Sequence, residues 1–282
     1  MKKIFFILLF SGCTLFDDDN EISQKIFAGS ELTLDIVSWN IENFPKNEST
    51  VDFLFPIIDS LNVDIVALQE IESTIALNNL TENLGDDWTS FRSENTSYGE
   101  LSYLINTNII NITTSPYKIL NSDYYYFAYR EPYVLEFEYN NTDYVLINIH
   151  YKCCDGSEER RLQASVILKN YIDENFSDFN VIVVGDFNDN LIDDENVFIP
   201  FLTDSTNYMF TDYSIAQGNS FQWSFPTYPS HIDHILVSSE LFDNVYNTEV
   251  LLIDQWFFDG FSDYNLFVSD HRPIVLQLDT EP

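Results

Sequence analysis

Residues 180–189 read NVIVVGDFND. The segment from Asn180 to Val184 is a short apolar run rich in β-branched side chains, which is typical of a buried strand. Gly185 and Asp186 end this run with turn residues, and Asn188 follows two positions later. The segment therefore predicts a buried strand that brings a carboxylate and an amide to one end of a sheet.

Four further apolar runs carry polar side chains at one end. The predicted strands cover residues 32–39, 64–68, 144–149 and 273–278, and the polar residues beside them are Asn40 with Glu42, Glu70, His150, and Asp270 with His271. Any one of these residues alone is more typical of turn chemistry. Layered sheets, however, gather such strand ends at one rim, and a rim with carboxylate, amide and imidazole groups predicts an enzyme site.

The rest of the chain mixes helices with strands. Residues 51–61 have helical apolar spacing, and a second helix is predicted from an N-cap at Ser157 to about Asn175, with a buried stripe of Leu162, Val166, Ile167 and Tyr171. Further strands are predicted at residues 101–105, 133–139 and 232–237, and a hairpin turn at residues 140–143. This order predicts an α/β fold, in which mixed sheets pack together with helices outside.

The composition is strongly acidic. Among 282 residues, 46 are Asp or Glu and 12 are Lys or Arg, so the formal net charge is −34. Repulsion from phosphate backbones excludes a passive nucleic-acid coat protein, and any nucleic-acid role has to be local and metal-bridged. Hydrophobic residues make up 45% of the chain, which is enough for a large core, so one globular domain is expected.

The first residues are typical of an export signal. Lys2 and Lys3 precede the apolar run 4–10, which is too short to span a bilayer, and Cys13 follows a pair of small residues. The pattern resembles a bacterial lipoprotein signal. Residues 1–12 are therefore interpreted as a signal segment, Cys13 as the lipidated residue, and residues 13–29 as an acidic flexible tether.

Two alternatives for this end stay open, namely an ordinary cleaved signal and a start codon misplaced downstream of the true one. Each interpretation predicts an exported protein, held at the bacterial cell envelope or surface by a lipid anchor in the membrane, or secreted.

Cys153 and Cys154 are adjacent in the sequence. In an exported protein they fit a vicinal disulfide or two reduced thiols, and both interpretations stay open. A structural zinc site is disfavoured, because no second cysteine pair exists to complete four ligands.

Six motifs together resemble the endonuclease/exonuclease/phosphatase superfamily, which includes deoxyribonuclease I, abasic-site endonucleases, neutral sphingomyelinases and inositol-polyphosphate 5-phosphatases. They follow the family's order, and they read WNIENF (39–44), LQE (68–70), NIH (148–150), GDFND (185–189), IDHI (232–235) and SDHRP (269–273). Residues 97–100 (SYGE) and 130–132 (REP) are similar to segments of the deoxyribonuclease I branch. The resemblance implies a four-layered α/β sandwich over residues 30–282, with two packed mixed β-sheets flanked by helices.

Phosphoester chemistry gives the acidic and amide residues their predicted roles. Mg²⁺ prefers oxygen ligands, and Mn²⁺ or Ca²⁺ can use the same donors. Glu70 is the first candidate metal ligand, helped by Asn40, and the resemblance adds Asp270. Asp186 and Asn188 are expected to orient the attacking water and to hold the non-bridging phosphate oxygens.

The histidines are the expected acid/base pair. His150 and His271 are the side chains at motif positions whose ordinary pKa lies near neutrality. An imidazole in this role needs an orienting carboxylate. The resemblance implies Glu100 for His150 and Asp233 for His271, and it implies that Arg130 contacts a substrate phosphate.

The predicted function is divalent-metal-dependent hydrolysis of phosphodiesters, in the first place by an extracellular deoxyribonuclease I-like endonuclease. The alternative among phosphoester hydrolases is a phosphodiesterase or phosphatase that acts on lipid headgroups or small phosphate esters. This alternative stays open because the charge of −34 weakens long-range attraction for DNA. A non-catalytic surface binding lipoprotein is the alternative outside this class of enzymes. No protein partner is expected, and the protein is predicted to be a monomer.

A zinc-hydrolase interpretation of His231, Asp233 and His234 is disfavoured, because no earlier His-x-His pair accompanies them. His231 and His234 are expected at the rim of the site or in a structural role.

Overall fold

The structure, a computed structural model, describes residues 29–30, 32–94 and 99–280. The interpreted signal segment, Cys13 and the tether as far as residue 28 lie outside the described residues, as do the first two residues of the SYGE motif. Across the described ranges, no helix combines the length and the apolar composition needed to cross a membrane.

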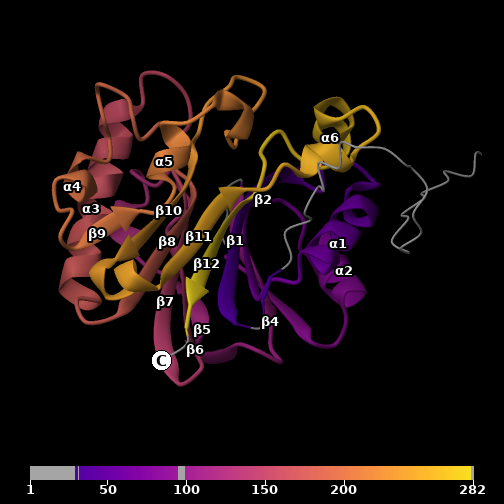
Figure 1. Cartoon of the computed structure of the whole chain (residues 1–282), viewed down its shortest axis with the longest axis horizontal. Coiled ribbons are helices and arrows are strands. Elements are labelled where there is room, and N and C mark those ends of the chain that lie inside the picture. Colours follow the sequence, from indigo (N-terminus) through magenta and orange to yellow (C-terminus); the bar gives the residue numbers. More distant parts are fainter. Residues whose placement is uncertain (1–28, 31, 95–98, 281–282) are drawn as a thin grey trace, which may run out of the picture.

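Two six-stranded sheets form the centre of the described fold (Figure 1). In spatial order, the first sheet contains β11 (Val245–Val250), β12 (Ile274–Asp279), β1 (Thr33–Phe44), β2 (Ile65–Ile71), β4 (Glu100–Asn106) and β3 (Trp88–Arg92). The second contains β5 (Asn111–Lys118), β6 (Tyr133–Tyr139), β7 (Thr142–His150), β8 (Asn180–Asp186), β10 (Asp233–Ser238) and β9 (Tyr208–Phe210).

Helices lie outside the two sheets (Figure 1). On the side of the first sheet are α1 (Thr50–Leu61), α2 (Thr74–Leu84) and α6 (Phe261–Phe267), and on the side of the second are α3 (Glu158–Asn175), α4 (Ile199–Leu202) and α5 (Tyr213–Ala216). Short 3-10 turns complete the connections, namely η1 (Asn121–Asp123), η2 (Ser220–Gln222), η3 (Ser239–Asn244) and η4 (Ile253–Trp256). The predicted four-layered α/β sandwich is thus confirmed.

Alternating side chains assign each strand face to a core. In β1, Leu34 and Ile36 join the core between the sheets, whereas Val37 and Trp39 face the helix layer of α1. A second outer core lies between β7 and α3. Burying each such aliphatic side chain contributes about 1.5–3 kcal/mol, so these three cores together fix which face of every strand turns inward.

Strand direction and alternation then bring the polar strand ends together. β1 runs parallel to β2 and β7 parallel to β8, whereas β12 and β10 run antiparallel to β1 and β8. The carboxyl ends of four strands therefore meet the amino ends of β10 and β12 at one edge. Asn40, His150, Asp186 and Asp233 are each an even number of residues from inward-facing core positions, so they point between the sheets.

Two predicted details differ from the structure. The hairpin turn is shorter than predicted, because Asn140 and Asn141 have φ of 49° and 62° and form a two-residue turn, with Thr142 already in β7. The predicted buried stripe of α3 is also displaced, since the buried side chains are those of Arg161, Ala164, Ser165, Leu168 and Ile172. Ala164, Leu168 and Ile172 of this face pack in the outer core, and Arg161 forms an ion pair with Asp189.

Candidate active site

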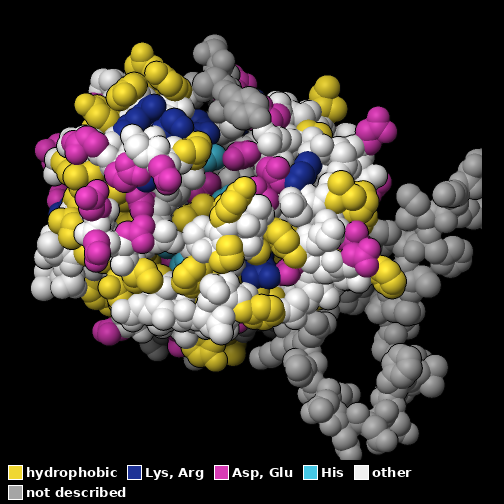
Figure 2. All heavy atoms as spheres, turned by 90° about the horizontal axis from the view of Figure 1, so that it is seen from above, with side chains coloured by type: hydrophobic (Ala, Val, Ile, Leu, Met, Phe, Trp, Pro, Cys, Tyr) yellow, Lys and Arg dark blue, Asp and Glu magenta, His cyan; other side chains and the backbone are white. Residues whose placement is uncertain are grey.

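A cleft of about 1120 Å³ opens at the edge where the strand ends meet. Figure 2 shows this side of the molecule, where a group of Lys and Arg side chains lies close to Asp and Glu side chains. The predicted site residues that line the cleft are Glu70, Arg130, His150, Asp186, Asn188, Asp270 and His271. Asn40 and Asp233 lie directly behind this wall, where they contact Asp186 and His271.

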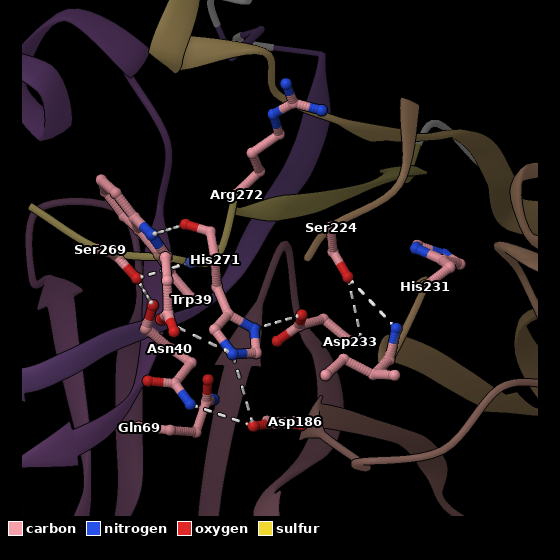
Figure 3. Close-up of polar contacts among 12 residues, drawn as sticks. Trp39, Asn40, Gln69, Asp186, Ser224, His231, Asp233, Ser269, His271 and Arg272 are labelled. Carbon is pink, nitrogen blue, oxygen red and sulfur yellow. Dashed lines mark hydrogen bonds and ion pairs between the residues drawn. The ribbon is translucent and has the colours of Figure 1, made fainter. Parts of the chain in front are cut away.

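Asp186 contacts Asn40 and His271 (Figure 3) as well as His150. Its Oδ2 is 3.3 Å from Nε2 of His150 and 3.9 Å from Nε2 of His271, and it accepts a hydrogen bond of 3.0 Å from Nδ2 of Asn40. Its Oδ1 accepts the backbone N–H of Asn188 at 2.9 Å. Burial raises the pKa of Asp186 to about 7, although His271 opposes the shift. The carboxyl group can therefore exchange a proton near neutrality.

His150 ends β7 and is held as a neutral ring. Burial, together with the charges of Arg130, His271 and Lys152, holds the pKa of His150 well below its usual value. Its Nδ1 is buried and has no hydrogen-bond partner among the described residues. A neutral imidazole beside Asp186 is a proton acceptor.

His271 is held in the opposite state. Its Nδ1 donates a hydrogen bond of 2.7 Å to Oδ2 of Asp233, the first residue of β10 (Figure 3). Burial opposes charge on the ring, but Asp233, with Asp186 and Asp270, outweighs it and raises the pKa of His271 to about 10. The ring is therefore an imidazolium whose Nε2–H faces the cleft and can donate a proton.

Glu70 reaches the site through an irregularity in β2. The register between β2 and β4 shifts between Leu68 and Ile71, and Glu70 has a left-handed φ of 64°. Without this bulge, strict alternation would point Glu70 away from the space between the sheets. Instead, its Oε1 accepts from Nδ2 of Asn40 at 3.1 Å, and its Oε2 accepts the N–H of Asn43 at 2.9 Å.

Several carboxylates are crowded at this end of the cleft. Oε2 of Glu42 accepts the backbone N–H of Asp270 at 3.1 Å. Burial raises the pKa of Asp270 to about 6. The charge of His271 opposes this rise, whereas repulsion from Glu42 and Glu70 adds to it. Hard oxygen donors with excess negative charge fit a divalent cation such as Mg²⁺. Glu70 and Asp270 are the residues that would hold it.

Asn40 lies between the carboxylates of Glu70 and Asp186 and contacts both. Its Oδ1 accepts the backbone N–H of Glu42 at 3.0 Å, so its amide nitrogen is the atom that faces Glu70 and Asp186. In this structure Asn40 positions the two carboxylates, and its role as a metal ligand stays a prediction.

The expected hydrogen bond between Glu100 and His150 is absent. Oε2 of Glu100 accepts from the hydroxyl of Ser93 at 2.5 Å, and within the described part of the chain Nδ1 of His150 has no hydrogen-bond partner. The physical reason lies in β4, because Leu101 and Tyr103 pack in the core between the sheets and leave Glu100 in the opposite phase. Glu100 does not orient His150 in this structure.

Arg130 belongs to a basic wall of the cleft. Its Nη2 donates to the carbonyl of Tyr151 at 2.9 Å, and a Cβ at Gly99 would lie 3.1 Å from its Nη1, so this glycine allows the guanidinium to approach. Lys152 and Arg160 extend the same wall. The cleft therefore carries fixed positive charge beside the carboxylates, as a phosphate-contacting segment requires.

His231 and His234 do not lie at the rim of the cleft. Both are buried with Asp212, whose Oδ2 is 2.9 Å from Nε2 of His231 and 2.6 Å from Nδ1 of His234. Nε2 of His234 contacts the carbonyl oxygen of Asp189 at 2.8 Å, so both nitrogens of this ring are used. These three residues could hold a metal by spacing alone, but the bonds to His234 leave it no lone pair for an ion.

Sequence reasoning did not assign several residues that line the cleft. Lys152 belongs to the loop after β7, and Phe225 lies with its ring centroid 4.7 Å from that of His271. Phe225 and Tyr228 belong to a turn that is closed by an isolated bridge between Phe225 and Ser230, outside the helices and named strands, so no helix or strand periodicity could have placed them. Glu42 lies within the WNIENF motif, which was the available signal.

A four-layered sandwich with these carboxylate, amide and imidazole groups at one edge is the arrangement of a phosphoric ester hydrolase. Residues 37–271 match the Endonuclease/Exonuclease/phosphatase family, and the chain belongs to this family. No curated protein matches the chain.

Solved structures share the fold. Humanized D. rerio TDP2 has a TM-score of 0.69 at 15% identity, over 89% of this chain and 100% of that one. The Bacteroides vulgatus endonuclease/exonuclease/phosphatase has a TM-score of 0.66 at 17% identity, over 88% of this chain and 99% of that one. The human Nocturnin catalytic domain with bound sulfate anion has a TM-score of 0.61 at 15% identity, over 87% of this chain and 93% of that one. At such identities these likenesses show the fold alone.

Proposed function

We propose that this protein is a divalent-metal-dependent phosphodiesterase. The observation that carries the proposal is the position of Asp186 between two histidines in opposite protonation states, 3.3 Å from one and 3.9 Å from the other. The surrounding carboxylates and the basic wall supply the remaining groups that phosphodiester hydrolysis requires.

The side chains divide the proton transfers between them. Neutral His150, with Asp186, can accept a proton from a water that attacks phosphorus. The imidazolium of His271, kept charged by Asp233, can give its Nε2 proton to the departing oxygen. A divalent cation, when bound by Glu70 and Asp270, would neutralise charge on the phosphoryl oxygens.

A DNA strand is the first substrate that we propose, with cleavage by an endonuclease of the deoxyribonuclease I type. Arg130, Lys152 and Arg160 on one wall provide contacts for phosphates beyond the scissile one. In support, D. rerio TDP2 has been solved complexed with single strand DNA product, and it shares the fold with a TM-score of 0.69 over 88% of this chain and 99% of that one, at 16% identity.

A small phosphate ester or a lipid headgroup is the second candidate. The acidic side chains of Asp155, Glu158, Asp193 and Glu195 also line the cleft. Negative charge at this position would repel the phosphates of a long strand, whereas an ester with one phosphate could lie wholly against the basic wall.

Export and anchoring remain part of the proposal. We propose that Cys13 is lipidated and fixes the enzyme to the cell envelope as a monomer, or that the chain is secreted. Incorporation of labelled fatty acid in the parent chain but not in Cys13→Ser would support the anchor, and equal labelling of both would contradict it.

Activity should be tested on a substrate panel, using a form that begins at residue 29, because the backbone N–H of Gly29 bonds to the carbonyl of Leu61. The panel contains plasmid DNA, single-stranded DNA, sphingomyelin, inositol phosphates and bis(4-nitrophenyl) phosphate, each with Mg²⁺ or Mn²⁺. His150→Ala is the inactive control, and Asp143→Asn, at the other end of the same strand, is the matched active control. Hydrolysis that survives in His150→Ala would contradict the assigned site, and no turnover of any substrate would favour a binding protein.

A further inference from the structure

The adjacent thiols of Cys153 and Cys154 lie in the wall of the cleft. Their Sγ atoms are 2.7 Å apart, and neither cysteine is in a disulfide. Cys154 is exposed and Cys153 is half-buried, so a small molecule can reach the pair. Neither thiol has a part in the proposed phosphodiester chemistry.

The backbone on both sides of the pair is fixed. Nη1 of Arg161 donates to the carbonyl oxygens of Lys152 at 2.9 Å and Cys154 at 3.1 Å. Arg161 itself is buried, and its Nε donates to Oδ2 of Asp189 at 2.8 Å. Cys154 has a left-handed φ of 77°, and its Sγ lies 2.7 Å from that of Cys153. The two sulfur atoms therefore face each other on a rigid loop.

The surroundings make the two thiols unequal. Nζ of Lys152 lies 3.3 Å from Sγ of Cys153. Burial opposes ionisation of Cys153, but the hydrogen bonds from Cys154 and Lys152 outweigh it and lower the pKa of this thiol. The hydrogen bond to Cys153 raises the pKa of Cys154. Because the thiolate is the nucleophile in disulfide exchange, Cys153 is the attacking residue and Cys154 the resolving one.

We propose that Cys153 and Cys154 form a redox-modification site whose reaction partner is a low-molecular-weight disulfide. In the first step, the thiolate of Cys153 attacks one sulfur of the disulfide, which forms a mixed disulfide and releases one thiolate. Cys154 then attacks the Cys153 sulfur, losing its proton to solvent, and the second small thiolate leaves. The two protein thiols are oxidised to an intrachain disulfide, and one small disulfide is reduced to two thiols.

The site is tested by treating the full chain with oxidised glutathione. The chain carries Cys13→Ser, so that free-thiol counts report the pair alone, and products are identified by intact mass and peptide mapping. We expect the 153–154 peptide to lose two hydrogens without keeping an adduct, and a dithiol reductant to reverse the change. Thermal unfolding of each variant checks that it is folded.

Single variants test the assigned order of attack. Cys154→Ser should keep one glutathione on Cys153, because no resolving thiol remains. Cys153→Ser should react at least about tenfold more slowly. Stable glutathione adducts in the chain with both cysteines, cross-linked dimers, or faster reaction of Cys153→Ser than of Cys154→Ser would overturn the proposal. None of these outcomes depends on phosphodiesterase activity.

Discussion

Two clusters of histidine and aspartate, which meet at the adjacent residues Asp233 and His234, behave oppositely. The cleft cluster contains His150, His271, Asp186 and Asp233, and the buried cluster contains His231, His234 and Asp212. In the cleft cluster, Nδ1 of His150 and Oδ1 of Asp233 have no hydrogen-bond partner among the described residues. The cleft carboxyl of Asp186 has a raised pKa.

The buried cluster does not line the cleft, and Nδ1 of His231 in it is likewise buried without a hydrogen-bond partner among the described residues. Burial favours the neutral form of Asp212, but His234 and His231 outweigh it and hold the pKa of Asp212 well below its usual range. Its Oδ1 also accepts the N–H of Ile235 at 3.0 Å, which fixes the start of β10. Burial likewise opposes charge on His234, yet Asp212 raises the pKa of that ring. Residue type alone therefore does not mark a reactive site, whereas titratable groups that line a cleft, such as Asp186 and His271, do.

The largest expected effect is the loss of activity in the cleft cluster. Asp186→Asn removes the proton-exchanging carboxyl between the two histidines and should lower kcat by about 10³–10⁴-fold. Its unfolding free energy should stay close to that of the parent, since an amide fills the same space. Initial rates with bis(4-nitrophenyl) phosphate, beside urea unfolding, check both parts, and Asp143→Asn is the matched control. A rate within about tenfold of the parent would remove Asp186 from the mechanism.

The buried cluster should respond in stability rather than in chemistry. Asp212→Asn leaves the charge of His234 buried without its partner and should lower the unfolding free energy by about 3–5 kcal/mol. The kcat of the molecules that remain folded should be unchanged. Urea unfolding measures the loss, with Asp243→Asn on the exposed η3 as control. If Asp212→Asn instead stays stable but inactive, the two clusters are not functionally distinct.

Asp233 shares features with both clusters. It is buried like Asp212, but its hydrogen-bond partner His271 lines the cleft. Asp233→Asn replaces the carboxylate that keeps His271 charged, so the pKa of His271 should fall and kcat should drop by about 10²-fold or more. The ¹⁵N chemical shifts of His271, followed against pH, measure the first effect. Unchanged titration of His271 in Asp233→Asn would contradict the role given to the pair.

The smallest expected effect is the change with pH in the stability that the buried ion pair of Asp212 and His234 contributes. The pKa of Asp212 is lowered in the folded state, so this residue stabilises the fold fully when the pH is above its ordinary pKa of 3.8. This contribution to the unfolding free energy is lost as the pH falls below that value. The pKa of His234 is raised in the folded state, so this residue stabilises the fold fully when the pH is below its ordinary pKa of 6.5. This contribution is lost as the pH rises above that value. The difference in unfolding free energy between the parent and Asp212→Asn should therefore be largest between pH 3.8 and 6.5. A difference that keeps growing above this window would contradict the assigned charges.

Much of the site follows from strand periodicity. Asn40, His150, Asp186 and Asp233 continue the inward phase of their strands, so the sequence could predict that they meet. The family's motifs supplied Asp270, which lies in a loop where no periodicity applies.

Other features depend on structure that local sequence does not encode. Glu70 faces the cleft because of a bulge, which alternation alone cannot predict. Glu100 was assigned by resemblance, but the phase of β4 turns it toward Ser93. The burial of His231 and His234 depends on Asp212, which lies about twenty residues earlier in the sequence and becomes a neighbour only through the fold.

The central claim is that a divalent cation at Glu70 and Asp270 supports phosphodiester hydrolysis in this cleft. The most direct test is the initial rate of bis(4-nitrophenyl) phosphate hydrolysis against Mg²⁺ concentration, after removal of metal with a chelator, for the parent and Glu70→Gln, with Glu138→Gln as the matched control. We predict that the parent and the control lose activity on chelation and regain it with Mg²⁺, whereas Glu70→Gln remains at background. Hydrolysis by the parent without a divalent cation, or full recovery of Glu70→Gln at the parent's Mg²⁺ concentration, would contradict the account.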